Sequence, residues 1–455
     1  MPANRLTCFK SYDIRGRVGV DLNEDLAFRI GWAFATCQRA KTVVVGRDGR
    51  ESSPALQAAL MGGLCAAGVD VVDIGQAGTE EVYFAVDHFG ADGGIEVTAS
   101  HNPIEYNGMK LVGPGAKPLR DGELGRLESL AIGCDPTLKK GNGTIRAKMA
   151  RTEYARRVVG LIDVKNLRPL RILVNAGNGV AGAAFDAIAA ELAARAAPLS
   201  FVRVNHNPDP LFPNGVLNPL LPENRDQTSQ AVLAAKADMG IAWDGDFDRC
   251  FFFDAAGHFV DGEHVVALLA AACLEDEPGG RIVHDRRVIW NVQSVVARAG
   301  GQAVPAKVGH VHMKHAMRQA DAIYGGEMSA HHYFRDFMFC DSGMIPWLKI
   351  AALLSKTGKP LSALVDEMRA NFPTSGETNF RVLNIAESVA KVSAVYRALA
   401  TEIDESDGLS LSFHDWRLNL RGSSTENFLR LNIETRGNAA LVALKLQEIR
   451  ALLAQ

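Results

Sequence analysis

A short acidic segment, Asp-Gly-Asp-Phe-Asp-Arg, is the strongest indication of chemistry in this sequence. It places Asp244, Asp246 and Asp248 at alternate positions, and alternate side chains of an extended chain share one face. Three clustered carboxylates repel one another unless a cation lies between them, and such hard oxygen ligands suit Mg²⁺, Mn²⁺ or Ca²⁺. An EF-hand is not expected, because Arg249 and Ala255 stand where its loop needs Gly and Glu. The segment therefore predicts a metal site rather than an acidic surface turn.

A serine in the segment Thr-Ala-Ser-His-Asn-Pro is a candidate nucleophile. Ser100 lies between a β-type run and a polar turn, and a base or a metal field would have to activate its hydroxyl. His101 is adjacent, but neighbouring side chains of an extended chain point apart and no Gly-x-Ser-x-Gly elbow occurs, so a Ser–His hydrolase pair is not expected. A turn-forming serine remains the alternative. Lys110 is either a proton shuttle, a phosphate contact or a solvated lysine.

Two further polar loops suit anionic or hydroxylated ligands. The segment 421–427 offers one guanidinium, hydroxyls and backbone N–H groups to a phosphate, although a polar hairpin tip would look the same. The segment 326–332 offers Glu327 and Ser329 to sugar hydroxyls, with His331 beside them. The spacing of His310, His312 and His315 fits no standard zinc pattern, so these histidines are expected to be structural or to contact phosphate.

The elements that must position these loops follow one plan three times. Each unit has two short apolar strands joined by a helix and a third strand that runs into a polar loop, which predicts layered α/β domains. Ligands bind outside the carboxyl ends of such strands, so the three loops are expected to face one cleft. The strands are expected at 42–45, 69–74, 94–97, 171–174, 200–204, 239–243, 281–283, 302–305 and 322–324. The first helix is expected to begin at Ser52 or Ser53 and to carry Leu56, Leu60 and Leu64.

The last ~80 residues follow a different pattern. Alternating apolar residues at 416–420 and 429–433 predict a hairpin with one buried face. Asn438 is expected to cap a final helix with Leu441, Leu444, Ile449 and Leu452 on one side. A linker is expected between Pro360 and Pro373, and an α+β domain after it.

Composition restricts the class of protein. The 455-residue chain has a formal net charge of −3, which provides no global field for nucleic acid or an anionic membrane. Its seven cysteines are scattered singly without a Cys-x-x-Cys pair, which favours a reducing cytoplasm over disulfides or a zinc site. The N-terminus has no apolar signal region, and apolar runs such as 265–274 are too short to span a bilayer.

Five motifs together resemble the α-D-phosphohexomutase superfamily, in its bacterial phosphomannomutase/phosphoglucomutase branch. They are FKSYDIRG at 9–16, TASHNP at 98–103, DGDFDR at 244–249, GEMSAHHYF at 326–334 and RGSSTEN at 421–427. The resemblance implies three related α/β domains with mixed sheets plus a C-terminal α+β (TBP-like) domain around a central cleft. The expected domains are 1–145 with the phosphoserine loop, 146–253 with the metal loop, 254–368 with the sugar loop and 369–455 with the phosphate loop.

The resemblance also implies residue roles. Ser100 would be the phosphoserine and would complete a site for one Mg²⁺ per chain with the three aspartates. The implied catalytic residues are Ser100, Lys110, His101, Arg249 and Arg15. The implied substrate-binding residues are Tyr12, Glu327, Ser329, His331, His310, Arg421, Ser423, Ser424 and Thr425. Ser424 and Asn427 depart from the Asn and Pro usual in the last motif, and a cleft role for Arg286 is left open.

The implied activity is interconversion of mannose 1-phosphate and mannose 6-phosphate, with hexose 1,6-bisphosphate as intermediate and activator. Glucose phosphates are further candidate substrates, and a main phosphoglucomutase or a metal-dependent sugar phosphatase is the alternative. A non-catalytic sugar-phosphate sensor is the alternative from another class. The expected partners are small sugar phosphates, with no nucleic acid and no membrane. The expected protein is cytoplasmic, a monomer or weak homodimer, and serves GDP-mannose biosynthesis.

Overall fold

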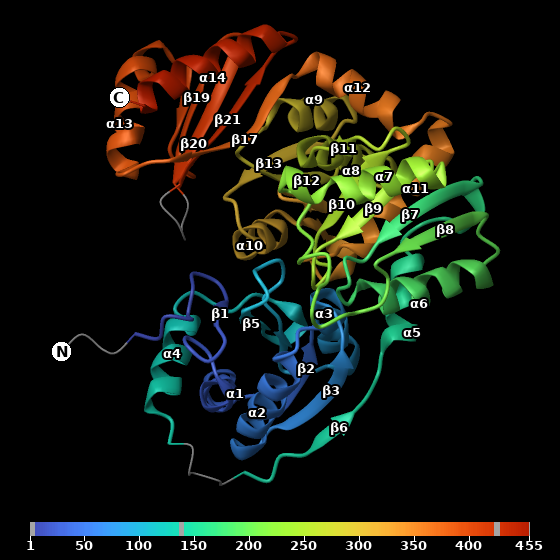
Figure 1. Cartoon of the computed structure of the whole chain (residues 1–455), viewed down its shortest axis with the longest axis vertical. Coiled ribbons are helices and arrows are strands. Elements are labelled where there is room, and N and C mark those ends of the chain that lie inside the picture. The colour runs from blue at the N-terminus through green and yellow to red at the C-terminus, as the bar shows by residue number, and fades with distance from the viewer. Residues whose placement is uncertain (1–4, 136–140, 423–427, 455) are drawn as a thin grey trace. The chain divides into compact units, whose positions relative to one another are not determined.

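The structure is a computed structural model that describes residues 5–135, 141–422 and 428–454 (Figure 1). The chain divides into two compact units. Unit 1 comprises Met1–Phe259 and His331–Gly358, and unit 2 comprises Val260–Ala330 and Lys359–Gln455. The described residues contain no helix long and apolar enough to cross a bilayer.

The first sheet of unit 1 has the strand order β1-β5-β4-β2-β3-β6. The central strands β2, β3 and β4 are parallel, whereas β5 runs antiparallel to β4 and to β1. Successive valines of β2 face opposite sides, so both faces of the sheet are apolar, and α1, α2 and α4 cover one face and α3 the other. The elements are β1 (Ile14–Arg17), α1 (Glu24–Gln38), β2 (Thr42–Arg47), α2 (Ser53–Ala66), β3 (Asp70–Gln76), α3 (Thr79–Phe89), β4 (Gly94–Val97), β5 (Tyr106–Val112), α4 (Glu123–Gly133) and β6 (Ile145–Ala147).

The start of α2 confirms the predicted position but not the predicted cap. Ser52 occupies the N-cap position, yet its side chain makes no capping hydrogen bond. Ser53 instead donates its hydroxyl to Asp48 Oδ1 at 2.5 Å, so the helix start is tied to the loop that follows β2. Leu56, Leu60 and Leu64 are buried as expected.

The second sheet of unit 1 contains the adjacent strands β10-β9-β7-β8. β7, β8 and β9 are parallel and β10 returns antiparallel to β9. The elements are α5 (Arg151–Val159), β7 (Leu170–Asn175), α6 (Ala181–Ala194), β8 (Leu199–Val204), α7 (Asp226–Ala235), β9 (Met239–Trp243) and β10 (Cys250–Asp254). The late segment 331–358 of unit 1 adds helix α11 (Met344–Thr357) and two short strands outside this sheet, β15 (His332–Phe334) and β16 (Cys340–Asp341), which pair antiparallel with each other. Strand β11 (Phe259–Val260) lies where unit 1 passes into unit 2.

Unit 2 begins with three parallel strands in the order β13-β12-β14. The elements are α8 (Gly262–Asp276), β12 (Arg281–Asp285), α9 (Trp290–Arg298), β13 (Gln302–Ala306), α10 (His310–Ala320), β14 (Tyr324–Gly326) and α12 (Leu361–Asn371). The third strand therefore lies two residues beyond its predicted position. The expected linker after Pro360 is helix α12, which packs on α8 because Leu361 and Val365 are buried.

The last sheet is antiparallel throughout, in the order β17-β21-β20-β19-β18. Its elements are β17 (Thr374–Arg381), α13 (Ile385–Tyr396), β18 (Glu402–Asp404), β19 (Leu409–Ser412), β20 (Trp416–Gly422), β21 (Phe428–Thr435) and α14 (Ala439–Leu453). Asn438 caps α14 as predicted, by accepting a hydrogen bond from the Leu441 amide at 3.0 Å. Leu444, by contrast, is 49% exposed and does not join the buried side of that helix.

The predicted hairpin forms, but both of its faces are buried near the middle. Arg417 and Glu434 lie on the polar face and form an ion pair at 3.0 Å. The connection between β12 and α9 covers them, since Arg417 donates to the Arg287 carbonyl and Glu434 accepts from the Trp290 amide, both at 2.9 Å. A polar face was predicted to be solvated, and an intervening loop with complementary backbone groups buries it instead.

Candidate active site

The loop after β4 holds Ser100 in an unusual backbone conformation. Ser100 has φ 51°, in the left-handed region that few non-glycine residues adopt, and it is only 2% exposed. Its amide donates to Thr98 Oγ1 at 2.9 Å, and the Asn102 amide donates to the Ala99 carbonyl at 3.0 Å. Such a conformation persists only where the surroundings determine it, which is a common property of functional loops.

Arg50 holds the serine loop in this backbone conformation. Its buried guanidinium donates to four carbonyls of the loop, those of Ser100 at 2.9 Å, Asn102 at 2.7 Å, Pro103 at 2.8 Å and Tyr106 at 3.1 Å. Arg50 is not recognisable from the sequence, because a single arginine in a polar turn carries no distinctive spacing.

The three aspartates were predicted to share one face of an extended segment. In the structure a turn brings them together instead. The Phe247 amide donates to the Asp244 carbonyl at 3.1 Å, and Phe247 has φ 45°. Asp244, Asp246 and Asp248 are each at most 2% exposed. Gly245 is required by close approach, since a Cβ there would lie 2.6 Å from the Ser100 carbonyl oxygen.

This turn and the serine loop form one site within unit 1. Ser100 Oγ donates to Asp244 Oδ2 at 3.0 Å, across 144 residues of sequence. The Lys110 ammonium contacts Asp246 Oδ2 at 2.6 Å and also Asp248 Oδ2. Thr79 Oγ1, at the start of α3, donates to Asp246 Oδ2 at 2.6 Å. The serine, the lysine and the acidic cluster predicted from separate motifs therefore lie together.

The acidic cluster fits a divalent cation. Oδ1 of Asp246 and Oδ1 of Asp248 are buried and accept no hydrogen bond from the residues that the structure describes. Carboxylate atoms of the three aspartates lie within 4.8 Å of one another. Buried acceptors that lack a donor are costly unless a cation satisfies them, and oxygen is the ligand that Mg²⁺ prefers.

Burial and neighbouring charges shift the pKa values of Asp244 and Lys110 in this cluster. Burial, reinforced by Asp248 and Asp246, raises the pKa of Asp244 to about 7. Burial opposes the charge of Lys110, but the surrounding aspartates outweigh it and raise the pKa of this ammonium. Lys110 is thus held as a cation while no metal neutralises the carboxylates.

His101 contacts Ser100, contrary to the prediction. Its Nδ1 lies 3.0 Å from Ser100 Oγ, because the left-handed conformation of Ser100 removes the alternation of an extended chain. Burial and the positive charges of Arg249, Arg15 and Lys110 lower the pKa of His101. A neutral imidazole therefore lies beside the serine hydroxyl.

A second group of side chains borders the acidic turn. Arg249 Nε donates to His331 Nε2 at 3.0 Å and lies 3.7 Å from Asp244 Oδ2. His331 Nδ1 lies 3.3 Å from Asp341 Oδ2, a residue that the sequence analysis did not name. A backbone bridge between Arg249 and His331 holds the two segments side by side.

The N-terminal motif reaches the serine loop through Arg15. Its guanidinium donates to Asn102 Oδ1 at 2.6 Å and to Asp13 Oδ2 at 2.6 Å. Tyr12, in the same motif, is 37% exposed.

Unit 2 carries the residues predicted to bind sugar and its distal phosphate. Glu327 is buried and accepts the Gly309 amide at 2.8 Å, which places it beside His310 at the start of α10. Ser329 Oγ accepts a hydrogen bond from Arg287 at 3.3 Å. Ser423, Ser424 and Thr425 lie outside the described residues. His312 and His315 follow on α10.

Arg286, whose role in the cleft was left open, and its neighbour Arg287 make different contacts in unit 2. Arg286 forms an ion pair with Asp404, whereas its neighbour Arg287 contacts Ser329. Arg421, at the end of β20, lies 3.8 Å from Glu377. Arg287 was not predicted, because two adjacent arginines cannot be ranked without their orientations.

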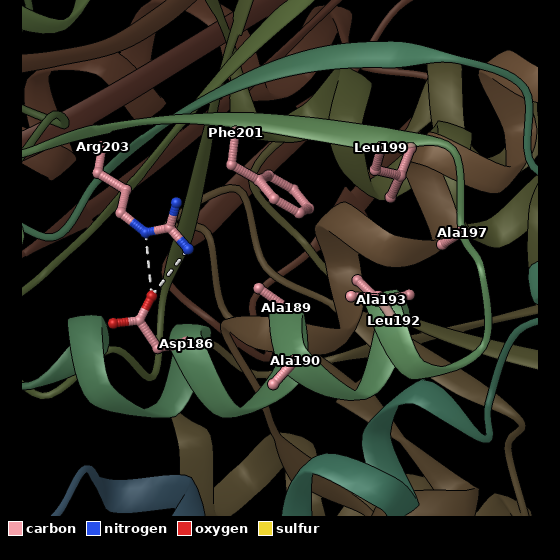
Figure 2. A pocket seen from close by; sticks show the side chains of 9 residues that line it. All are labelled: Asp186, Ala189, Ala190, Leu192, Ala193, Ala197, Leu199, Phe201 and Arg203. Carbon is pink, nitrogen blue, oxygen red and sulfur yellow. Dashed lines mark hydrogen bonds and ion pairs between the residues drawn. The ribbon is translucent and has the colours of Figure 1, made fainter.

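A surface hollow of about 440 Å³ lies elsewhere in unit 1, between α6 and β8. Figure 2 shows Arg203 paired with Asp186 at one end and Phe201 near the middle. Most of its lining is aliphatic, and it contains none of the predicted site residues. It is lined by Asp186, Ala189, Ala190, Leu192, Ala193, Ala197, Leu199, Phe201 and Arg203.

Comparisons with known proteins agree with the geometry. The family description "Phosphoglucomutase/phosphomannomutase, alpha/beta/alpha" matches as domain I over residues 7–131, domain II over 152–257 and domain III over 261–372. A phosphomannomutase of Salmonella montevideo is 53% identical over 453 residues, which cover 99% of each chain. Phosphohexose mutases of Xanthomonas campestris pv. campestris (strain B100) are 51% identical over 449 residues, 98% of this chain and 99% of the relative.

The solved structure of a phosphoglucomutase/phosphomannomutase family protein from Burkholderia thailandensis has a TM-score of 0.87 and 32% identity, and the match covers 98% of this chain and 96% of that one. The fold and the site thus define a layered α/β protein with a buried acidic cluster, suited to a cation, beside a serine hydroxyl. The chain belongs to the phosphoglucomutase/phosphomannomutase family, as the five motifs indicated.

Proposed function

We propose that this chain is a phosphomannomutase that interconverts mannose 1-phosphate and mannose 6-phosphate through a phosphorylated Ser100. The observation that carries the proposal is the 3.0 Å contact between Ser100 Oγ and Asp244, inside a buried acidic cluster that Lys110 also enters. The full-length relative at 53% identity named phosphomannomutase supports the choice of activity.

The proposed reaction is a phosphoryl relay. The bond between phosphorus and Ser100 Oγ breaks as the sugar hydroxyl forms a new bond to phosphorus, and the hydroxyl proton passes to a base of the site. The resulting hexose 1,6-bisphosphate turns end over end, and Ser100 recovers the other phosphoryl group. The same parts serve the reverse direction, so the bisphosphate is both intermediate and activator.

Separate residues transfer protons, stabilise charge and bind the substrate in the proposed reaction. His101 is neutral and lies 3.0 Å from Ser100 Oγ, so it takes the serine proton when Ser100 recovers a phosphoryl group, and the imidazolium so formed gives that proton back when Ser100 next loses one. Arg249 and Arg15 stabilise charge on the transferring oxygens. Glu327 and Ser329 bind sugar hydroxyls, while Arg421 and the loop after it bind the distal phosphate.

The proposed cation is Mg²⁺, one per chain, held by the three aspartates and an oxygen on Ser100. When bound, it offsets the carboxylate charge and the charge of the transferring phosphoryl group. Lys110 can release its proton only when its aspartate partners are otherwise neutralised, because they raise its pKa. In that state Lys110 acts as the base for the sugar hydroxyl.

The first experiment is mass spectrometry of the purified protein with and without Ser100→Ala, beside a coupled mutase assay with Mg²⁺ and trace bisphosphate. We expect phosphate on Ser100 and loss of mutase turnover in the variant. An active Ser100→Ala protein would eliminate the relay. Release of inorganic phosphate without Ser100 would indicate the phosphatase alternative, and binding of sugar phosphate without turnover by the wild type would indicate a sensor.

The second experiment is substrate choice. A site that contacts hydroxyls common to mannose and glucose discriminates weakly at C2, because rejection of an epimer needs a buried group that the epimer leaves unpaired. We therefore expect turnover of glucose 1-phosphate as well. The ratio of kcat/KM for mannose 1-phosphate and glucose 1-phosphate measures this, and a ratio far above one would support strict mannose specificity.

We also propose the domain division 1–145, 146–253, 254–368 and 369–455. The three family matches and the antiparallel last sheet support these bounds.

A further inference from the structure

The first residue of helix α3 holds the middle aspartate of the acidic turn. Thr79 is fully buried, and its Oγ1 donates to Asp246 Oδ2 at 2.6 Å, across 167 residues of sequence. The Thr79 amide also donates to the Asp246 carbonyl, at 3.2 Å. Asp246 is therefore fixed by α3 through both its backbone and its side chain.

Close packing holds the turn against α3 independently of that hydroxyl. Gly78, just before the helix, has no room for a side chain, since a Cβ there would lie 2.1 Å from Cε1 of Phe247. Phe247 is itself fully buried and follows Asp246 in the turn. This packing and the backbone bond from Thr79 fix the turn, so the Thr79 hydroxyl has a separate effect, which is confined to the carboxylate of Asp246.

The two oxygens of the Asp246 carboxylate have different surroundings. Oδ2 accepts hydrogen bonds from Thr79 Oγ1 and from Lys110 Nζ, each at 2.6 Å. Oδ1 is buried and accepts none from the residues that the structure describes. A buried acceptor without a donor is costly, so Oδ1 is the oxygen that Asp246 offers to a cation.

Thr79 is the more constant of the two donors to Oδ2. In the proposed reaction Lys110 gives up its proton, so its contact with Asp246 changes with the charge of the site. A threonine hydroxyl is neutral and keeps its proton in every charge state of the cluster. Thr79 thus keeps Oδ2 engaged throughout, and Asp246 offers a cation one oxygen instead of two.

The number of oxygens that a carboxylate offers distinguishes Mg²⁺ from Ca²⁺. Mg²⁺ is small and requires a nearly ideal octahedron of ligands, whereas Ca²⁺ accepts more oxygens in a flexible arrangement and often takes both oxygens of one carboxylate. Restriction of Asp246 to one oxygen therefore suits Mg²⁺ and withholds a ligand from Ca²⁺. A group that orients a metal ligand typically changes metal affinity by about 10- to 100-fold.

We propose that Thr79 is a positioning residue that sets cation selectivity, because its hydroxyl restricts Asp246 to a single ligand oxygen. The choice of Mg²⁺ as the resident cation rests on the proposed function, whereas the restraint on Asp246 rests on the contacts of Thr79 alone. Thr79 takes no part in phosphoryl or proton transfer.

The test compares Thr79→Val, which keeps the branched shape without the hydroxyl, with Thr79→Ser, which keeps the hydroxyl. Calorimetric titration of the full-length protein gives the Kd of Mg²⁺ and of Ca²⁺. In Thr79→Val we expect the Kd of Mg²⁺ to rise by about 10- to 100-fold and that of Ca²⁺ by less than about threefold. Thr79→Ser should retain both wild-type values.

Thr144→Val is the matched control. It removes an exposed hydroxyl that donates to Asp70 Oδ1 at 2.7 Å, so it loses the same kind of hydrogen bond at the first residue of β3. Both dissociation constants should equal those of the wild type.

Other results overturn the proposal. Equal losses of affinity for the two cations in Thr79→Val would mean that the hydroxyl supports the turn without selecting a cation, and unchanged affinities would mean that it does not act on the ligand. Should Thr79→Val fail to fold, as judged by thermal unfolding, Thr79→Ala decides by the same two constants. A wild type that binds neither cation also overturns it. A wild type that binds Mg²⁺ without mutase turnover refutes the proposed function and leaves this measurement valid.

Discussion

Ser100 and the three aspartates come within reach of one another through two residues with left-handed backbone. Ser100 has φ 51° and Phe247 has φ 45°, and each turns the chain where an extended strand would have carried the side chains apart. The result is a compact site in which Asp244 holds the serine hydroxyl while Lys110 holds the other two aspartates. Asp244 is thus the aspartate of the cluster with which Lys110 forms no ion pair, and burial raises its pKa.

We predict that Mg²⁺ affinity falls as the pH is lowered through about 7. Burial raises the pKa of Asp244 to about 7, and a ligand carboxylate must lose its proton before it binds a metal. Below that pH the affinity should drop by up to about tenfold per pH unit. Calorimetric titration at pH 6 and pH 8 measures the change, and Asp244→Asn should bind weakly with little pH dependence. Equal affinities of the wild type at both values would contradict the assignment of Asp244.

At the scale of elements, loops are held by buried polar side chains that come from other elements. Arg50, from the loop between β2 and α2, ties the serine loop through four carbonyls. Glu80 in α3 accepts the Tyr154 hydroxyl from α5 and the Gly343 amide at the start of α11, the latter at 2.7 Å. These side chains set the position of functional loops without touching the reacting groups.

We predict that Arg50→Lys lowers kcat about a hundredfold, because displacement of a catalytic group by about 1 Å has an effect of that size. A lysine cannot reproduce the planar fork that reaches several carbonyls, so the serine loop should shift and the free energy of unfolding should fall by about 2 kcal/mol. Steady-state kinetics and denaturant unfolding measure both effects. Arg195→Lys, at an exposed pair with Glu191 on α6, is the control and should behave as the wild type.

Glu80 gives a pH dependence of stability. Burial raises the pKa of Glu80 to about 8, although hydrogen bonds from Ser342, Tyr154 and Gly343 oppose the shift. The folded state thus retains a proton that the unfolded chain releases near its ordinary pKa. The stabilisation is complete below the unfolded pKa and is lost as the pH rises towards about 8, with a slope of at most about 1.4 kcal/mol per pH unit.

Substitution of Glu80 by a side chain that does not titrate should remove this pH dependence of the free energy of unfolding. Glu80→Gln keeps the shape and an acceptor oxygen, so its free energy of unfolding should change less between pH 5 and pH 8 than that of the wild type. Denaturant titrations across this range test the expectation. Parallel pH profiles for the two proteins would show that Glu80 is ionised in the fold.

At the scale of the whole molecule, the chain separates its chemical groups between two compact units. Unit 1 holds the serine, the acidic turn, Lys110 and Arg249, including a late segment with His331 and Asp341. Unit 2 holds Glu327, Ser329, Arg287 and Arg421. The division does not follow chain order, because residues 331–358 return to unit 1 and supply α11 and the short strands before it.

We predict that Mg²⁺ alone protects only unit 1 in amide hydrogen exchange. Segments 98–103 and 244–249 should exchange more slowly with the metal, because the proposed ligands all lie in them and binding stabilises the folded form. Strand β20 in unit 2 should be unchanged. Protection confined to unit 2 would place the metal elsewhere, and Asp246→Asn should abolish the effect in unit 1.

The sequence by itself determined most of the elements and the parts of the site. Short apolar runs located β2, β7 and β9 to within a residue or two, because a central strand that is covered on both faces is almost continuously apolar. The polar loops after β4, β9 and β14 were recognisable because an apolar run ends where each begins, and their motifs indicated the family that the comparisons confirm.

Only the tertiary structure decided which groups meet. The Ser100–Asp244 contact, the hydrogen bonds of Arg50 to the serine loop and the Arg421–Glu377 pair each join residues far apart in sequence. The contact of His101 with Ser100, which periodicity excluded, depends on one left-handed residue. Periodicity reports which face of an element is buried. It does not report which other element covers that face or where the backbone leaves its regular form, and these depend on packing of the whole chain.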